Sequence, residues 1–349
     1  MHIDLLLGYS GRKMELPMRQ IQLAEELGFR AVWTAEAYGS DAVTPAAWIL
    51  AQTTRLKVGT AIMQMPARSP AMAAMTAMTL SELSKGRFIV GLGASGPQVV
   101  EGWHGVPYGK PVTRLREYVS IMRNIFERKS PATYDGSVYQ LPYRGVDATG
   151  LGKPLKSILT STHEVPILAA TITPAGVSAA AEVADGFFPV WMDPEKYSVF
   201  APALNRGFLA AGKSDGFDFQ VSPFVSVSMG ENIEQCMAPM RDTMALYIGG
   251  MGARNKNFYN NYTKALGFEE AAIKIQDLFL SGKKDEAAAA VPAELIDACH
   301  LVGPEARIRK RLERWKTAAD KGHVSAMLLN CPQQEALKVV ANEMQLAPQ

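Results

Sequence analysis

The stretch "SPAMAAMTAMTLSELSKGRFIVGLGASG", residues 69–96, holds one helical pattern and one strand pattern, and it decides how the chain folds. Ser69-Pro70 is a typical helix start, because serine caps free N–H groups and proline fits the first helical position. The helical pattern ends at Gly86. The following run "RFIVGLG", residues 87–93, is almost continuously apolar, which is typical of a strand covered on both faces. The stretch therefore predicts a helix that leads into a buried parallel strand.

The same alternation recurs along the whole chain. Each β-rich run is followed by a helical pattern or by a loop that leads to one. The eight runs lie at 3–8, 30–36, 56–63, 87–93, 165–171, 184–191, 219–229 and 324–330. Near-continuous apolar strands separated by amphipathic helices indicate a parallel sheet covered by helices. Eight such units in 349 residues predict an α/β protein of one domain, residues 1–349, closed into a (β/α)8 barrel.

Two stretches exceed this repeat. Residues 129–164 and 250–300 are expected to be insertions before the fifth and the eighth strand. The first contains Asp135-Gly136 between two β-rich arms, which predicts a hairpin turn. The second is helical and rich in alanine. Insertions of this kind often cap the mouth of a barrel or form a subunit interface, and the residues favour neither role.

Three glycines follow the spacing G-x-G-x-x-G at Gly91, Gly93 and Gly96. In dinucleotide-binding folds a helix begins at the third glycine. Here prolines and glycines recur from 97 to 111, so the sequence predicts no helix for some distance. The loop instead follows the fourth strand, and barrel active sites lie on such loops. Its small residues could present backbone N–H groups to an anion, or it could be a tight turn that only joins strand to helix.

Composition limits the class of partner. The 36 basic and 34 acidic residues give a net charge of +2, which argues against nucleic acid or an anionic membrane and favours a small-molecule partner. Cys236, Cys299 and Cys331 are an odd number and lie far apart, as expected in a reducing compartment such as the cytoplasm. No segment approaches the roughly 20 apolar residues of a membrane span. No histidines or cysteines have metal-ligand spacing, so we expect no metal site.

Three side chains on the predicted catalytic face are candidates for catalysis. Glu36 ends an apolar strand, where a buried carboxylate with a raised pKa could transfer a proton; the alternative is an ion pair with Arg68 at the rim. Tyr38 follows on the same loop and could supply a phenol donor. His104 is the one histidine in a candidate active-site loop. Trp103-His104 could face the substrate or pack the loop onto the barrel.

The central block of the chain has a recognisable pattern. The run "RSPAMAAMTAMTLSELSKGRFIVGLGASGPQVVEGWHGVPYGKP", with "ELGFRAVWTAEAYGSD" before it and "LVGPEARIRKRLERW" after it, resembles the luciferase-like monooxygenase superfamily. More narrowly, it resembles the branch of coenzyme F420-dependent oxidoreductases that includes methylenetetrahydromethanopterin reductase. The resemblance covers nearly the whole chain. It implies a (β/α)8 barrel, a deazaflavin ring at the carboxyl ends of the strands, and a homodimer.

The resemblance also implies three cofactor-binding elements. A non-prolyl cis peptide bond supports the rear of the ring, the loop after the fourth strand holds the phosphate-bearing tail, and the loop after the fifth strand adds backbone contacts. Together with the carboxylate that faces the ring, the matching residues are Glu36, Ala61, Ile62, Met63, Gln64, Gly93, Ala94, Ser95, Gly96, Thr171, Ile172 and Thr173. The cis bond maps to Ala61-Ile62.

The activity implied is hydride transfer between reduced coenzyme F420 and a small organic substrate. One alternative is a monooxygenase that uses FMN and oxygen. Another is a barrel that only binds a ligand, because two motifs depart from the family. Glu36-Ala37 stands where relatives often carry Asp-His, and "AATITP" at 169–174 replaces a glycine-rich loop.

Overall fold

A parallel sheet forms the centre of the computed structural model, which describes residues 1–214, 216, 218–252 and 254–347. Its strand order is β10-β9-β8-β5-β3-β2-β1-β13-β11-β12, and a bridge between Val190 and Phe224 joins its two flanks into a barrel. A strand lies within each of the eight predicted runs, but the run at 219–229 is interrupted at Ser222-Pro223 and forms two strands. The main strands are β1 (His2–Leu6), β2 (Ala31–Thr34), β3 (Lys57–Thr60), β5 (Phe88–Gly93), β8 (Ile167–Ala170), β9 (Gly186–Phe188), β11 (Phe224–Met229) and β13 (Ala326–Asn330).

Shorter strands extend this sheet at three places. β4 (Met63–Gln64) pairs with β5, β10 (Gln220–Val221) with β9, and β12 (Leu301–Gly303) with β11. β12 is not predicted from the sequence, because its three residues are too few to show the periodicity of a strand.

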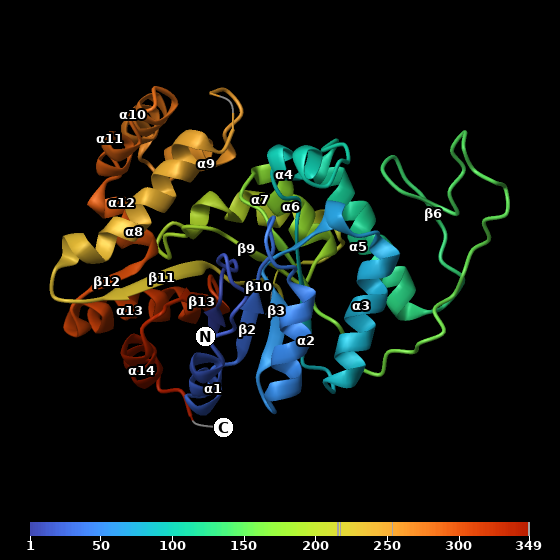
Figure 1. Ribbon diagram of the computed structural model, residues 1–349, viewed down its shortest axis with the longest axis horizontal. Helices are drawn as coiled ribbons and strands as arrows, with labels where there is room; N and C mark the ends of the chain where they lie inside the picture. The colour runs from blue at the N-terminus through green and yellow to red at the C-terminus, as the bar shows by residue number, and fades with distance from the viewer. Residues whose placement is uncertain (215, 217, 253, 348–349) are drawn as a thin grey trace.

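Helices cover the barrel and connect its strands (Figure 1). The α-helices are α1 (Met18–Glu26), α2 (Val43–Gln52), α3 (Pro70–Leu83), α4 (Pro97–Gly102), α5 (Pro111–Glu127), α6 (Pro174–Val183), α7 (Ala201–Ala210), α8 (Ile233–Ala245), α9 (Phe258–Ala265), α10 (Glu269–Leu280), α11 (Lys284–Ala289), α12 (Ala293–Cys299), α13 (Glu305–Asp320) and α14 (Gln334–Glu343). Two short 3-10 helices, η1 (Met65–Ala67) and η2 (Tyr197–Val199), and one π-helix, η3 (Leu246–Gly250), complete the set. No helix in the described ranges is both long and apolar enough to cross a membrane.

Helix starts follow local chemistry. α3 begins as predicted, because the Ser69 hydroxyl accepts a hydrogen bond from the Met72 N–H at 3.1 Å. The prediction of no helix directly after the glycine loop is wrong, since α4 begins at Pro97 with Gly96 before it. Proline interrupts a helix interior but suits the first helical position, where its missing N–H would have no partner.

The glycine loop owes part of its sequence to packing inside the barrel. Trp33 and Phe188 fill the interior with their rings 5.1 Å apart at 81°. A side chain at Gly91 would place its Cβ 1.8 Å from the carbonyl oxygen of Thr60 and 2.8 Å from the Phe188 ring. The first glycine of the G-x-G-x-x-G spacing is therefore required by close packing between strands.

The two predicted insertions have different shapes. Figure 1 shows the first as an open excursion beside α3 and α5, and α8 to α12 packed together on the opposite side of the barrel. The predicted hairpin is present as β6 (Tyr134–Asp135) and β7 (Gln140–Leu141), and the Gly136 N–H donates to the Tyr139 carbonyl at 2.9 Å. The second excursion is helical, as expected, and η3 leads into it.

Candidate active site at the carboxyl ends of the strands

Glu36, which follows β2, is held by four hydrogen bonds. Its Oε1 accepts from Arg68 at 2.5 Å and from the Gln64 N–H at 2.7 Å. Its Oε2 accepts from Arg68 and from the Ala42 N–H, both at 2.9 Å. The carboxylate is 5% exposed. Its two bonds to Arg68 form the ion pair that is the alternative to a catalytic role for Glu36. A catalytic role for Glu36 stays a prediction, and it would require one of these bonds to break.

Arg68 carries the matching charge. Burial alone would lower the pKa of Arg68, but the hydrogen bonds and the charge of Glu36 outweigh burial and raise it. Arg68 therefore keeps its positive charge at neutral pH, and its ion pair with Glu36 is bidentate. It joins the loop after β2 to the start of α3.

The predicted ring-supporting residues lie directly beside this pair. The Ala61-Ile62 peptide bond is cis, as the resemblance implied. The Ile62 carbonyl accepts from the Glu36 N–H at 3.3 Å. The Ile62 side chain covers Gly93, where an added Cβ would lie 2.7 Å from Ile62 Cγ1. The ends of β2, β3 and β5 thus bring Glu36, Ile62 and Gly93 together.

Gln64 connects this group to His104. Its amide nitrogen donates to the Ala37 carbonyl at 2.7 Å, and its Oε1 lies 3.2 Å from His104 Nε2. A backbone carbonyl only accepts, so the amide nitrogen must face Ala37 and the amide oxygen must face the histidine. His104 therefore carries a proton on Nε2. The half-buried ring contacts one predicted cofactor residue, Gln64, and a catalytic role for His104 stays a prediction.

The two predicted phosphate loops both present free backbone donors. Ser95 has a left-handed backbone at φ 60°. Among the described residues, the N–H groups of Ser95 and Gly96 meet no protein acceptor. After β8, the Thr173 hydroxyl accepts from the Gly176 N–H at 3.1 Å and so caps α6. Among the described residues, the N–H groups of Thr171, Ile172 and Thr173 likewise meet no protein acceptor, so both loops present free backbone donors. Only the Thr173 hydroxyl already has a structural partner, and Thr171 and Ile172 are half-buried.

An aromatic cluster, defined here as Trp191, Tyr247 and Tyr259, lies on another side of the barrel mouth. Trp191 comes shortly after β9, Tyr247 lies in η3, and Tyr259 lies in the first turn of α9. The ring centroids are 5.8 Å apart for Trp191 and Tyr247, 5.6 Å for Trp191 and Tyr259, and 4.8 Å for the two tyrosines. The aromatic cluster is not predicted from the sequence, because its three residues follow no regular spacing along the chain.

Phenols from other loops approach the aromatic cluster. Burial raises the pKa of Tyr247, and the neighbouring hydroxyls of Tyr9, Tyr259 and Tyr38 raise it further. Burial, Tyr9 and Tyr108 raise the pKa of Tyr259 to about 12. The predicted catalytic residue Tyr38 is 69% exposed, and its effect on the pKa of Tyr247 shows that its phenol lies near the aromatic cluster.

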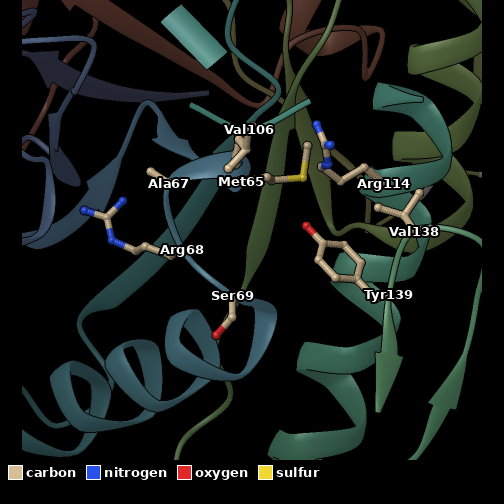
Figure 2. A pocket seen from close by; sticks show the side chains of 9 residues that line it. Met65, Ala67, Arg68, Ser69, Val106, Arg114, Val138 and Tyr139 are labelled. Carbon is tan, nitrogen blue, oxygen red and sulfur yellow. The ribbon is translucent and has the colours of Figure 1, made fainter. Parts of the chain in front are cut away.

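A pocket of about 300 Å³ opens beside the Glu36–Arg68 pair. Figure 2 shows its lining, with the Tyr139 hydroxyl directed toward Met65 and the Arg114 side chain. Arg114, on α5, is buried and donates to the carbonyls of Tyr108 at 2.8 Å and Pro107 at 2.9 Å. These bonds fasten the loop that carries His104 to the barrel wall.

The cysteines are buried and reduced. Cys236, Cys299 and Cys331 are all free thiols. Burial raises the pKa of Cys331 to about 11 and that of Cys299 further, so both stay protonated at neutral pH. Within the described residues, no three His, Cys, Asp or Glu side chains are placed to hold a metal ion.

Comparison with known proteins agrees with this architecture. The model of the luciferase-like monooxygenase family matches residues 8–321. A protein of Mycobacterium tuberculosis, provisionally named a coenzyme F420-dependent oxidoreductase, is 40% identical over 91% of this chain and 92% of its own. The F420-dependent tetrahydromethanopterin reductase of Methanopyrus kandleri superposes with a TM-score of 0.75 at 20% identity, covering 98% and 97% of the two chains. An F420-dependent secondary alcohol dehydrogenase, solved with an F420–acetone adduct, gives a TM-score of 0.74 at 19% identity and coverages of 99% and 98%.

Proposed function

Because the chain belongs to the luciferase-like monooxygenase family, we propose that it is an oxidoreductase that transfers a hydride between coenzyme F420 and a small organic substrate. The observation that carries the proposal is the meeting of Ile62, Gly93 and Gln64 beside backbone N–H groups without protein acceptors. The 40% identity to a relative named for coenzyme F420 supports the choice of cofactor.

The residues present fit the cofactor. Unpaired N–H groups at Ser95 and Gly96 suit a phosphate, because they need an acceptor and their loop has no bulky side chains. Ala61 and Ile62, with Met63 and Gln64 beside them, would support the rear of the ring. When bound, the deazaflavin supplies or accepts the hydride.

The chain's own groups would handle position and protons. Reduction of a carbonyl adds a hydride to carbon and a proton to oxygen, and oxidises the deazaflavin. We assign Glu36 a positioning role, because it ties together the N–H groups of Ala42 and Gln64 and the guanidinium of Arg68. His104 and Tyr38 carry exchangeable protons over the mouth, and they are the candidates for proton transfer to the substrate.

Cofactor binding tests the proposal. The apoprotein is titrated separately with coenzyme F420 and with FMN, and turnover of a ketone is then measured without oxygen. We expect binding of F420 and oxygen-independent turnover. Binding of FMN alone, with product that requires oxygen, would instead establish a monooxygenase. Binding of either cofactor without turnover of any ketone, enone or imine would favour a ligand-binding barrel.

A homodimer is also proposed. Met72, Met75 and Leu83 project exposed from α3, and Trp48 is exposed on α2. Apolar side chains gathered on a surface typically mark an interface. Sedimentation of wild type and Met75→Glu checks the proposal, since a dimer through this face should dissociate in the variant. The cytoplasm remains the expected location.

A further inference from the structure

Trp191 of the aromatic cluster is held in an unusual conformation. Its backbone is left-handed at φ 46°, which is rare for a bulky side chain and concentrates at functional sites. Two groups from the second excursion fix it, since the Trp191 carbonyl accepts from the Tyr262 hydroxyl at 3.2 Å and from the Cys299 thiol at 3.0 Å. The excursion therefore orients the indole ring that follows β9.

The same excursion fixes Tyr247. The Asn257 side chain donates to the carbonyls of Tyr247 at 3.0 Å and Ile248 at 2.9 Å, and it is almost fully buried. Gly249 lets Phe279 approach, because an added Cβ would lie 2.4 Å from that of Phe279. These contacts hold the π-helix η3, a rare element that is frequent at functional sites. Trp191 and Tyr247 are thus both positioned by residues that do not belong to the barrel.

The surface they form is neutral. The phenols of Tyr9, Tyr38 and Tyr108 approach the two tyrosines of the aromatic cluster, whose high pKa values keep their own phenols protonated at neutral pH. The buried Asp193, two residues after Trp191, is paired with Arg314. The charges of the nearby strand ends, Glu36 and Arg68, are paired with each other. Trp191 is only 5% exposed and lies behind the half-buried Tyr247 and Tyr259, so a ligand at this surface would meet the tyrosine rings and O–H donors rather than a free charge.

This chemistry suits one class of substrate. Aromatic rings pack best against other flat, apolar groups, and a phenol O–H needs an acceptor. We propose that the aromatic cluster is the substrate-recognition surface of the oxidoreductase proposed above, and that it selects flat, conjugated, uncharged carbonyl compounds whose oxygen accepts a hydrogen bond from Tyr247. The inference rests on the proposed function for its reaction, but binding can be measured without it.

Binding of two probes tests this inference. The affinities of 4-phenyl-3-buten-2-one and butan-2-one are measured by calorimetry, with and without bound F420. We expect the conjugated probe to bind at least tenfold more tightly. Tyr247→Phe should weaken its binding about tenfold, the loss of one hydrogen bond, and leave F420 binding unchanged. Tyr259→Leu should reduce the preference between the two probes.

Matched controls keep the result interpretable. Tyr143→Phe removes an exposed phenol in the first excursion and should change neither affinity. Circular dichroism and thermal unfolding establish that each variant is folded. Equal affinity for the two probes, or equal effects of Tyr247→Phe and Tyr143→Phe, would overturn the inference. Failure of F420 to bind would refute the proposed cofactor while leaving the probe measurements without F420 valid.

Discussion

On the β2 and β3 side of the barrel mouth, charges are paired, whereas on the β9 and β11 side the contacts are between neutral aromatic rings. Glu36 and Arg68 come from the ends of barrel elements, and the backbone partners of Glu36 are the N–H groups of Gln64 in β4 and of Ala42 just before α2. Trp191, by contrast, is oriented by Tyr262 and Cys299 of an excursion. The barrel's own elements thus build one side, and inserted chain builds the other. Substitutions in the excursion should therefore alter the aromatic side while leaving the charged side intact.

Removal of Arg68 should give the largest effect. Arg68→Met leaves Glu36 buried without its cation, which costs about 3 to 5 kcal/mol of unfolding free energy. Urea denaturation measures the loss. The double variant Glu36→Gln, Arg68→Met should recover much of it, because no charge remains buried. A loss below about 1 kcal/mol, typical of exposed pairs, would show that the charged side contributes little.

Asn257→Ala should loosen the aromatic side. The variant removes the donors to Tyr247 and Ile248 and the cap on α9, where Asn257 accepts from the Asn260 N–H at 3.0 Å. We expect a loss of about 2 to 3 kcal/mol, together with faster hydrogen exchange in η3. The exposed neighbour Asn261→Ala is the control. Exchange that accelerates equally around Glu36 would contradict the independence of the two sides.

Glu117 offers a buried carboxylate held without a cation, for comparison with Glu36. It accepts from the N–H groups of Ser137 at 2.8 Å, Val138 at 2.9 Å and Tyr139 at 2.8 Å. Burial opposes ionisation, but these bonds outweigh it and lower the pKa of Glu117 below its ordinary value of 4.5. The stabilisation is therefore present above pH 4.5 and is lost as the pH falls through the lowered pKa.

Glu117→Gln should accordingly cost about 1 to 2 kcal/mol at pH 7, because the amide keeps the shape but loses the charge on the acceptor. The gap between wild type and variant should narrow below pH 4.5. Urea denaturation at several pH values measures it, with the exposed Glu127→Gln on the same helix as control. A gap independent of pH would rule out the charged carboxylate as its source.

Tyr262→Phe should have the smallest effect. It removes one hydrogen bond to the Trp191 carbonyl and leaves the bond from Cys299, so the expected loss is about 1 kcal/mol. Thermal unfolding measures the loss, and a change in indole fluorescence that Tyr143→Phe lacks would locate it at Trp191. Unchanged fluorescence would mean that Cys299 alone suffices.

The sequence predicts the barrel well because its signals are local. Each of the eight predicted strands is part of an apolar run, and Ser69-Pro70 marks a helix start by its own chemistry. The prediction at α4 is wrong because proline both breaks helix interiors and begins helices, and Pro97 stands at a helix start. The sequence predicts the ion pair of Glu36 with Arg68 only as an alternative to a catalytic Glu36. The two residues are 32 positions apart, and their contact depends on the fold.

The aromatic cluster, in contrast, has no local signal in the sequence. Tyr247 and Tyr259 meet Trp191 only because a π-helix turns the chain and Asn257 holds its carbonyls. The sequence does not show why Gly249 and Gly250 are glycines. In the structure Phe279 packs so closely against both that a side chain would not fit. Contacts of this kind depend on tertiary packing, which no periodicity within the excursion encodes.

The hydrogen bond between Gln64 and His104 has one fixed direction. Since Gln64 presents its amide oxygen, the imidazole donates from Nε2 whether the ring is neutral or cationic. The Gln64 amide therefore fixes the edge of the ring that faces β4, and it ties the loop after α4 to the barrel.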